Sequence, residues 1–256
     1  MASSFFDLHG TAALVTGGNS GIGLGMARGL AAAGADVAIW GTSEAKNHAA
    51  AAELEELGGR VVALACDVGD EDRVEEAFAE TVARLGGLDA CFANAGVSGR
   101  APSFLEMTLD EWHRVLRVNL DGAFLTLRAA ARCLVGQGRG GSLVATASLA
   151  AVEGQARGQH YAATKGGLVS MMKALAVELA RYGVRANTIL PGWVETPMTE
   201  PAFAWDRFRE KVLPRVPVRR WGVPDDFAGI ACYLASGAST YHTADTFVID
   251  GGYSVF

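Results

Sequence analysis

The feature that most constrains this fold is a repeated alternation between short, β-branched apolar runs and longer amphipathic stretches. Seven apolar runs predict strands, at 11–18, 35–41, 60–68, 88–96, 141–148, 184–192 and 246–252. The stretches between them predict helices, at 20–33, 43–59, 70–86, 104–108, 110–136 and 158–182. Strands that alternate with helices form a parallel sheet, with right-handed crossovers. The sequence therefore predicts an α/β, doubly wound fold with a seven-stranded parallel sheet flanked by helices on both faces.

No linker, internal repeat or low-complexity run divides residues 1–256, so we expect a single domain. Residues 193–222 interrupt the alternation with a stretch rich in Trp, Phe, Met, Pro and Arg. A long segment with no strand of its own is usually a functional loop, and we interpret this one as a substrate lid. The alternative is a pair of surface helices that packs against a neighbouring subunit.

Charge and hydropathy argue against several classes of partner. The chain has a net charge of −6 and no concentration of lysine and arginine, so no nucleic-acid partner is expected. No apolar stretch approaches ~18 residues, so no membrane span is expected. Residues 1–10 lack a basic start and a long apolar stretch, which predicts no secretory signal and a cytoplasmic protein. The four cysteines and five histidines are scattered and predict no metal site.

A glycine-rich turn, "TGGNSGIG" at 16–23, joins the first predicted strand to the first helix. Gly17, Gly21 and Gly23 would let the backbone turn tightly and approach a pyrophosphate, while the helix N-terminus supplies N–H groups and a positive dipole end. The string departs from the GxGxxG pattern because Met26 stands in place of the third glycine. A plain glycine-rich turn remains the alternative.

Two polar strand ends lie at the same predicted sheet edge. "CDV" places Asp67 after the third strand, where its carboxylate could meet an adenine amino group. "NAG" places Asn94 and Gly96 after the fourth strand. Each also fits a simple turn, because Asp, Asn and Gly often end strands.

The string "YAATK" places Tyr161 four residues before Lys165, so both lie on one helix face. A nearby ammonium favours the phenolate and lowers the pKa of a tyrosine. The pair would then be an acid/base that works near neutral pH. Alone, the motif also fits a solvated helix surface.

Seven motifs in order carry a resemblance: "TGGNSGIG", "CDV", "NAG", "VNLDG", Ser148 thirteen residues before the tyrosine, "YAATK" and "PGWVETPM". In this order they resemble the short-chain dehydrogenase/reductase family, and the match runs from about residue 8 to 253. The resemblance implies a Rossmann fold and a nicotinamide cofactor. The departures are small: Ala93 and Ala147 stand where the family often has Asn and Ser.

The resemblance implies a role for each of four catalytic residues. Tyr161 would be the acid/base, and Lys165 would lower its pKa and bind the nicotinamide ribose. Ser148 would donate a hydrogen bond to the substrate oxygen. Asn119 would hold a water that connects Lys165 to solvent. The alternatives are that Ser148 caps a turn and that Asn119 bonds a nearby backbone carbonyl.

The resemblance also implies the binding residues. Thr196 and the backbone of Val194 would hold the nicotinamide carboxamide. The implied cofactor residues are Gly17, Asn19, Ser20, Gly21, Ile22, Gly23, Thr42, Ser43, Asp67, Val68, Asn94, Ala95, Gly96, Tyr161, Lys165, Pro191, Gly192, Val194 and Thr196. The implied substrate residues are Ser148, Gln155, His160, Tyr161, Trp193 and Met198.

The choice of nicotinamide cofactor depends on the end of the second strand, where Asp or Glu would bind the adenosine ribose and favour NAD. Here Gly41 and Thr42 occupy that place, so no carboxylate repels a 2′-phosphate. Thr42 and Ser43 could donate hydrogen bonds to it, so we expect NADP in preference to NAD. The alternative is that Thr42 only caps the next helix.

The function expected from the resemblance is hydride transfer between a nicotinamide cofactor and a small-molecule ketone or secondary alcohol. A β-ketoacyl-thioester reductase is a specific alternative, although net acidity disfavours an acidic carrier protein as its partner. A dehalogenase on this fold would need an arginine at Lys165, and a non-enzymatic nucleotide sensor would lack the tyrosine or the lysine. The resemblance also implies a homotetramer.

Overall fold

The sheet is seven-stranded and all-parallel. A computed structural model describes residues 5–99 and 101–256. Its strand order is β3-β2-β1-β4-β5-β6-β7, which confirms the predicted doubly wound α/β fold. The strands are β1 (Ala12–Thr16), β2 (Asp36–Gly41), β3 (Val61–Ala65), β4 (Ala90–Ala93), β5 (Gly141–Thr146), β6 (Val184–Pro191) and β7 (Thr246–Ile249).

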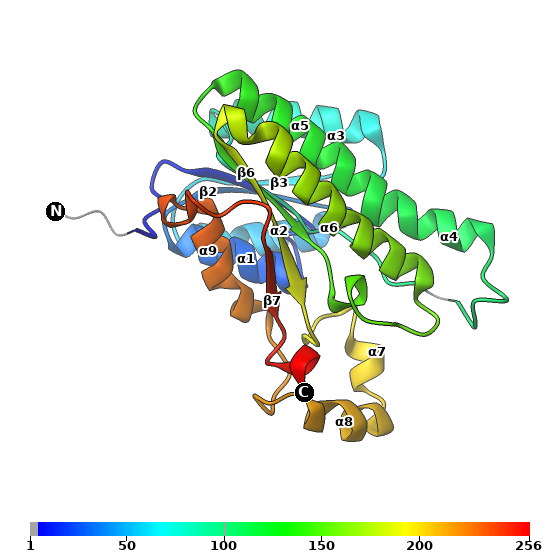
Figure 1. The fold of residues 1–256 in the computed structure, drawn as a ribbon. Helices are drawn as coiled ribbons and strands as arrows, with labels where there is room; N and C mark the ends of the chain where they lie inside the picture. Colours follow the sequence, from blue (N-terminus) through cyan, green and yellow to red (C-terminus); the bar gives the residue numbers. More distant parts are fainter. Residues whose placement is uncertain (1–4, 100) are drawn as a thin grey trace.

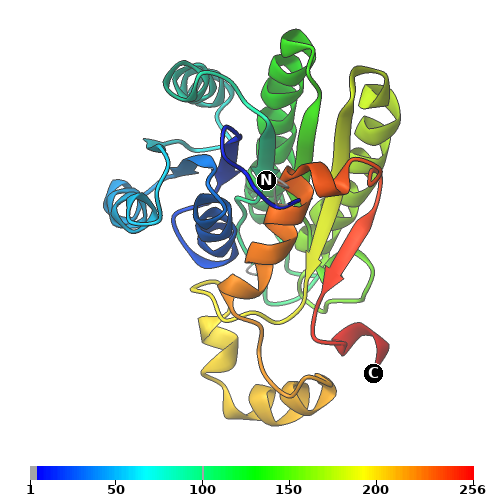
Figure 2. The same cartoon turned by 90° about the vertical axis from the view of Figure 1, so that its left-hand side faces the viewer.

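Helices cover both faces of the sheet (Figures 1 and 2). One layer contains α1 (Gly21–Ala32), α2 (Glu44–Glu55) and α9 (Ala228–Ala235). The other contains α3 (Glu71–Leu85), α4 (Leu109–Leu116), α5 (Gly122–Gln137) and α6 (Gln159–Leu179). Side chains alternate between the two faces of a strand. Accordingly, Val15 of β1 packs in the first core and Leu14 in the second.

The helical stretch predicted at 110–136 exists, but it contains a short π-helical segment, Arg117–Asp121, between α4 and α5. The helix predicted at 104–108 is wrong, because these residues form turns. Thr108 is the N-cap of α4 and accepts a hydrogen bond from the Glu111 backbone at 3.2 Å, so the helix starts only after it.

The helix α9 was not predicted, because no part of 223–245 was assigned a structure. Together with the 3₁₀ turn before it, Pro224–Phe227, it packs closely on α1, and two glycines permit this approach. A Cβ on Gly25 would lie 2.1 Å from the Pro224 carbonyl oxygen, and one on Gly29 would lie 2.7 Å from the Cβ of Ala228. A sequence pattern cannot show which helix a glycine face will meet.

Residues 193–222 form an extension beyond the carboxyl ends of the strands (Figures 1 and 2). It contains two short helices, α7 (Glu200–Phe203) and α8 (Asp206–Val212). Aromatic rings hold it together: Phe203 stacks on Trp221 at 4.4 Å between centroids, and Phe208 meets Trp193 edge-on at 4.8 Å. The role of this extension as a lid stays a prediction.

Within the described residues, no helix has the length and apolar character needed to cross a membrane. The expectation of no secretory signal rests partly on residues 1–4, which lie outside the described residues.

Candidate active site

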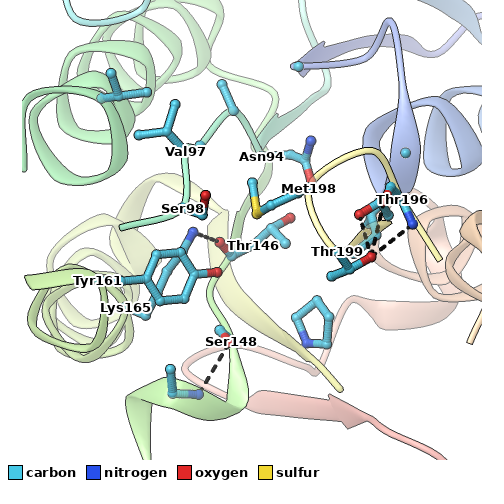
Figure 3. A pocket seen from close by; sticks show the side chains of 18 of the residues that line it. Asn94, Val97, Ser98, Thr146, Ser148, Tyr161, Lys165, Thr196, Met198 and Thr199 are labelled. Atoms are coloured by element: carbon cyan, nitrogen blue, oxygen red, sulfur yellow. Dashed lines mark hydrogen bonds between the residues drawn. The ribbon is translucent and has the colours of Figure 1, made fainter. Parts of the chain in front are cut away.

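A cavity of about 960 Å³ opens at the carboxyl ends of the strands (Figure 3). Residues that follow all seven strands line it, which is where open α/β sheets bind ligands. Of the predicted site residues, all line this cavity except Gly23, Asn119 and His160. The fold thus brings together residues that are far apart in the sequence.

The glycine turn after β1 is built for close backbone approach. Gly17 has φ +63, and a Cβ there would lie 3.1 Å from the Cα of Ala95. A Cβ on Gly23 would lie 2.3 Å from the Gly17 carbonyl oxygen, so Gly23 shapes the turn although it does not line the cavity. The backbone N–H groups of Asn94 and Ala95 both donate to the Thr16 hydroxyl at 3.0 Å. These contacts leave a cradle at the N-terminus of α1 that fits a diphosphate.

The end of β2 carries no acidic side chain into the cavity. Ser43, and not Thr42, is the N-cap of α2, with its hydroxyl 3.4 Å from the Lys46 backbone nitrogen. The alternative that Thr42 caps this helix is therefore wrong, and Thr42 is exposed at the cavity. Lys46, in the first turn of α2, also lines the cavity and was not predicted. The sequence feature that could have identified it is a lysine about one helical turn after the end of β2.

Asp67 lines the cavity after β3, but its carboxylate already has partners. One oxygen accepts from the Gly69 backbone at 3.0 Å, and the other accepts from Arg117 at 3.0 Å. Arg117 lies in the π-helical segment and also lines the cavity. Nothing in the sequence pattern pairs these two residues, which are fifty positions apart.

Tyr161 and Lys165 extend from one face of α6 into the cavity, as the four-residue spacing predicts (Figure 3). Lys165 is only 3% exposed, and its ammonium donates to the Thr146 carbonyl oxygen at 2.8 Å. The same ammonium lies 5.5 Å from the centroid of the Tyr161 ring. Lys165 is therefore tied to the end of β5, with the Tyr161 ring beside it.

The expected lowering of the tyrosine pKa is wrong for this state of the protein. Burial raises the pKa of Tyr161, and the hydroxyl of Ser148 opposes this only in part. Burial also lowers the pKa of Lys165 to about 8. Near pH 8, Lys165 is therefore only partly charged. It lowers the pKa of Tyr161 less than the four-residue spacing predicts.

Ser148 and Asn119 form the contacts that were expected from the sequence as alternatives to a catalytic role: a capped turn and a bond to nearby backbone. The Ser148 hydroxyl accepts from the Ala150 backbone at 3.2 Å, yet the residue also lines the cavity. The Asn119 amide bonds the Val97 backbone twice, accepting at 2.7 Å and donating at 3.0 Å. It is buried behind Gly96, where a Cβ would lie 3.2 Å from its oxygen and 3.6 Å from the Lys165 ammonium. Asn119 thus holds the loop after β4 beside the lysine.

The side of the cavity that the resemblance assigns to the nicotinamide is closed by a turn after β6. The Thr199 hydroxyl accepts from the Thr196 backbone at 3.0 Å and lies 3.1 Å from the Thr196 hydroxyl (Figure 3). It also donates to the Val194 carbonyl at 2.5 Å. Thr199 was not predicted, although it fixes both residues that were assigned to the carboxamide.

Of the predicted substrate residues, Gln155, Trp193 and Met198 line the cavity, whereas His160 does not. Its ring is fully buried, with Nε2 3.2 Å from a carboxylate oxygen of Glu111. A Cβ on Gly99 would lie 2.1 Å from the ring, so His160 packs behind the loop that lines the cavity. His160 is expected from the sequence to serve either in packing or in the substrate wall, and the structure places it in packing.

Comparison with known proteins gives consistent matches along the chain. A family model described as enoyl-(acyl carrier protein) reductase matches residues 17–254. An L-rhamnose 1-dehydrogenase (NAD(P)(+)) from Sphingomonas sp. (strain SKA58) is 39% identical over 246 residues, 96% of each chain. A 3-oxoacyl-(acyl-carrier-protein) reductase from Chlamydia pneumoniae is 36% identical and covers 96% of this chain and 97% of its own. The crystal structure of a gluconate 5-dehydrogenase from Burkholderia cenocepacia J2315, in complex with NADP and tartrate, has a TM-score of 0.94 at 36% identity over the whole of both chains.

Proposed function

The chain belongs to the short-chain dehydrogenase/reductase family, and on that premise we propose that it is an NADP-preferring dehydrogenase of polyhydroxylated compounds. Its reaction is NAD(P)-dependent transfer of a hydride between the cofactor and a ketone or secondary alcohol. The nicotinamide, when bound, supplies the redox chemistry. The residues of the chain must then position the substrate and move one proton.

In this proposal, Tyr161 moves the proton. It gives a proton to the substrate oxygen during reduction and takes one back during oxidation. The convergence of its hydroxyl with Ser148 and Lys165 in one cavity carries the proposal (Figure 3). Ser148 donates a hydrogen bond to the same oxygen, where charge develops. Asn119 keeps Gly96 and the loop after β4 in place beside Lys165.

The preference for NADP is supported by the residues around the end of β2. Thr42 offers a hydroxyl, and Lys46 offers a positive charge at the N-terminus of α2, where an anion is favoured. No acidic side chain among the described residues after β2 lines the cavity at this point. These features suit the extra phosphate of NADP better than the free ribose hydroxyl of NAD.

The substrate class is supported by the relatives and by the polar lining of the cavity. Proteins named as L-rhamnose 1-dehydrogenase and gluconate 5-dehydrogenase are similar over nearly their whole length. Ser98, Glu153 and Gln155 can exchange hydrogen bonds with hydroxyl groups, and Met198 and Trp193 provide apolar walls. A short polyhydroxylated chain matches this mixture.

We propose that the protein assembles as a cytoplasmic homotetramer. Apolar side chains are exposed on α5 and α6 and near the C-terminus, at Phe124, Val177, Tyr241 and Val255. Val177 is 81% exposed in the single chain. It lies on α6, which has many small residues and so permits close approach of another helix. Burial of these side chains between subunits would remove apolar surface from water, which supports association.

The proposed function is tested with purified protein, NADPH or NADH, and a panel of ketoses, keto acids and simple ketones, together with the reverse reaction on polyols. We expect turnover of polyhydroxylated compounds and a higher kcat/KM with NADP(H) than with NAD(H). Intact nucleotide binding without turnover of any compound would instead indicate a nucleotide sensor.

A β-ketoacyl-thioester reductase is the second candidate, because one similar protein carries that name. The net charge of −6 disfavours an acidic carrier-protein partner. Activity on a β-ketoacyl thioester that exceeds activity on every polyol would select this candidate over the first.

A further inference from the structure

One segment contributes three polar residues to the lining of the cavity, close in sequence to Tyr161. It connects the 3₁₀ turn Leu149–Ala151 to α6 and includes Glu153, Gln155 and Arg157, all of which line the cavity. Arg157 is exposed and lies four residues before Tyr161. The segment therefore borders the place where the substrate must sit.

The other positive charges at the cavity are either paired or lie away from the substrate end. Arg117 is paired with Asp67, and the Lys165 ammonium is bonded to a backbone carbonyl. Lys46 lies at the other end, beside the residues after β2. With the residues that the structure describes, the Arg157 side chain forms neither an ion pair nor a hydrogen bond. Its guanidinium is thus an available cation at the substrate end.

The backbone of Arg157 is also unusual. Its φ is +65, in the left-handed region that glycine adopts without cost and that costs other residues about 1 kcal/mol. Strained backbone conformations of this kind concentrate at functional sites. An arginine that adopts this conformation, where glycine would cost less, is consistent with a function of its side chain.

We propose that Arg157 binds a carboxylate of the substrate, so that the enzyme prefers hydroxy acids derived from sugars to the neutral sugars and polyols. A guanidinium holds a carboxylate by two parallel hydrogen bonds, which orients it as well as attracting it. The carboxylate then fixes one end of the chain while a hydroxyl further along meets Tyr161. This inference rests on the proposed function, because it names the substrate class within it.

Glu153 lies in the same segment and carries a negative charge. It forms no ion pair with Arg157, so it does not neutralise the guanidinium. As an acceptor, it suits the hydroxyl groups of the same substrate. Removing its charge with Glu153→Gln should therefore strengthen the preference for acids, since one repulsion is lost.

The test compares matched substrates that differ only in the acidic group, an aldonate and the alditol of the same carbon skeleton, with NADP as oxidant. We expect wild-type kcat/KM to favour the aldonate, and Arg157→Gln to reduce the aldonate-to-alditol ratio by about 10- to 100-fold, the range for a hydrogen bond to a charged group. Arg157→Gly, which suits the positive φ, should reduce the ratio equally while keeping the fold. The control is Arg84→Gln on α3, where the guanidinium pairs with Glu80 away from the cavity.

Three outcomes would overturn the inference. The first is a wild-type enzyme that prefers the alditol, and the second is a ratio that stays unchanged in both Arg157 variants. In these two cases the polyol dehydrogenase function still stands. If neither aldonates nor alditols are turned over, the proposed function fails and the inference fails with it.

Discussion

The ammonium of Lys165 donates a hydrogen bond of 2.8 Å to the carbonyl oxygen of Thr146, which ties α6 to the end of β5. The lysine is buried by this contact and lies 5.5 Å from the ring centroid of Tyr161. Burial lowers its pKa to about 8, so the charge of the site depends on pH near neutrality. Both the stability and the activity of the protein should therefore depend on pH in this range.

Lys165→Met should change how stability depends on pH. The pKa of Lys165 falls from 10.5 to about 8 on folding. The cost of burying the charged lysine is therefore present in full below about pH 8. The cost disappears as pH rises from about 8 to 10.5. Relative to the variant, the wild type should therefore gain stability with rising pH, by up to about 1.4 kcal/mol per pH unit.

Urea unfolding of both proteins at about pH 7, 9 and 10 measures this difference. Titration of the four cysteines, whose thiol pKa values are raised by burial, affects both proteins equally and cancels in the comparison. Parallel curves for the two proteins would show that Lys165 keeps its ordinary pKa.

Tyr161→Phe should remove the proton donor and leave the ring in place. We expect kcat to fall by at least about 100-fold, as for other losses of a general acid or base. NADPH affinity, measured by fluorescence titration, should stay near that of the wild type because only a hydroxyl is lost. Near-normal turnover in this variant would mean that another group moves the proton.

Two substitutions at the end of β2 test the choice of cofactor. Thr42→Asp places a negative charge near the 2′-phosphate and should shift the NADPH-to-NADH ratio of kcat/KM toward NADH by about tenfold or more. Lys46→Gln should lower the same ratio by a few-fold, because an exposed ion pair contributes at most about 1 kcal/mol. Lys173→Gln, at an exposed position of α6 that does not line the cavity, is the matched control. An unchanged ratio in Thr42→Asp would remove the case for NADP.

Most of the sheet and the central site could be predicted because they depend on local patterns. Apolar runs mark the strands, and the end of each strand must lie at one edge of a parallel sheet. Tyr161, Lys165 and Ser148 reach the cavity for this reason. The α6 spacing of four residues is likewise a local rule.

The remainder depends on contacts between distant residues, which no local pattern encodes. Whether Asp67 meets Arg117, or Lys165 meets Thr146, is decided by how the elements pack. His160 is next to Tyr161 in sequence, yet helix geometry turns it away and Gly99 admits it behind the loop. The prediction that the pKa of Tyr161 is lowered was wrong for the same reason, because burial is a property of the whole fold.

The close packing of α1 on the 3₁₀ turn Pro224–Phe227, which leads into α9, gives a stability prediction with an internal control. A Cβ at Gly25 would lie 2.1 Å from the Pro224 carbonyl oxygen, so Gly25→Ala must push the two elements apart. Overpacking of this kind costs roughly 1–3 kcal/mol, which should appear as a lower urea midpoint. Gly136→Ala on α5 makes the same change at an exposed helical position with nothing within 4 Å, and it should stabilise the protein by up to about 1 kcal/mol. If both variants shift the midpoint in the same direction, helix propensity rather than packing decides the effect at Gly25.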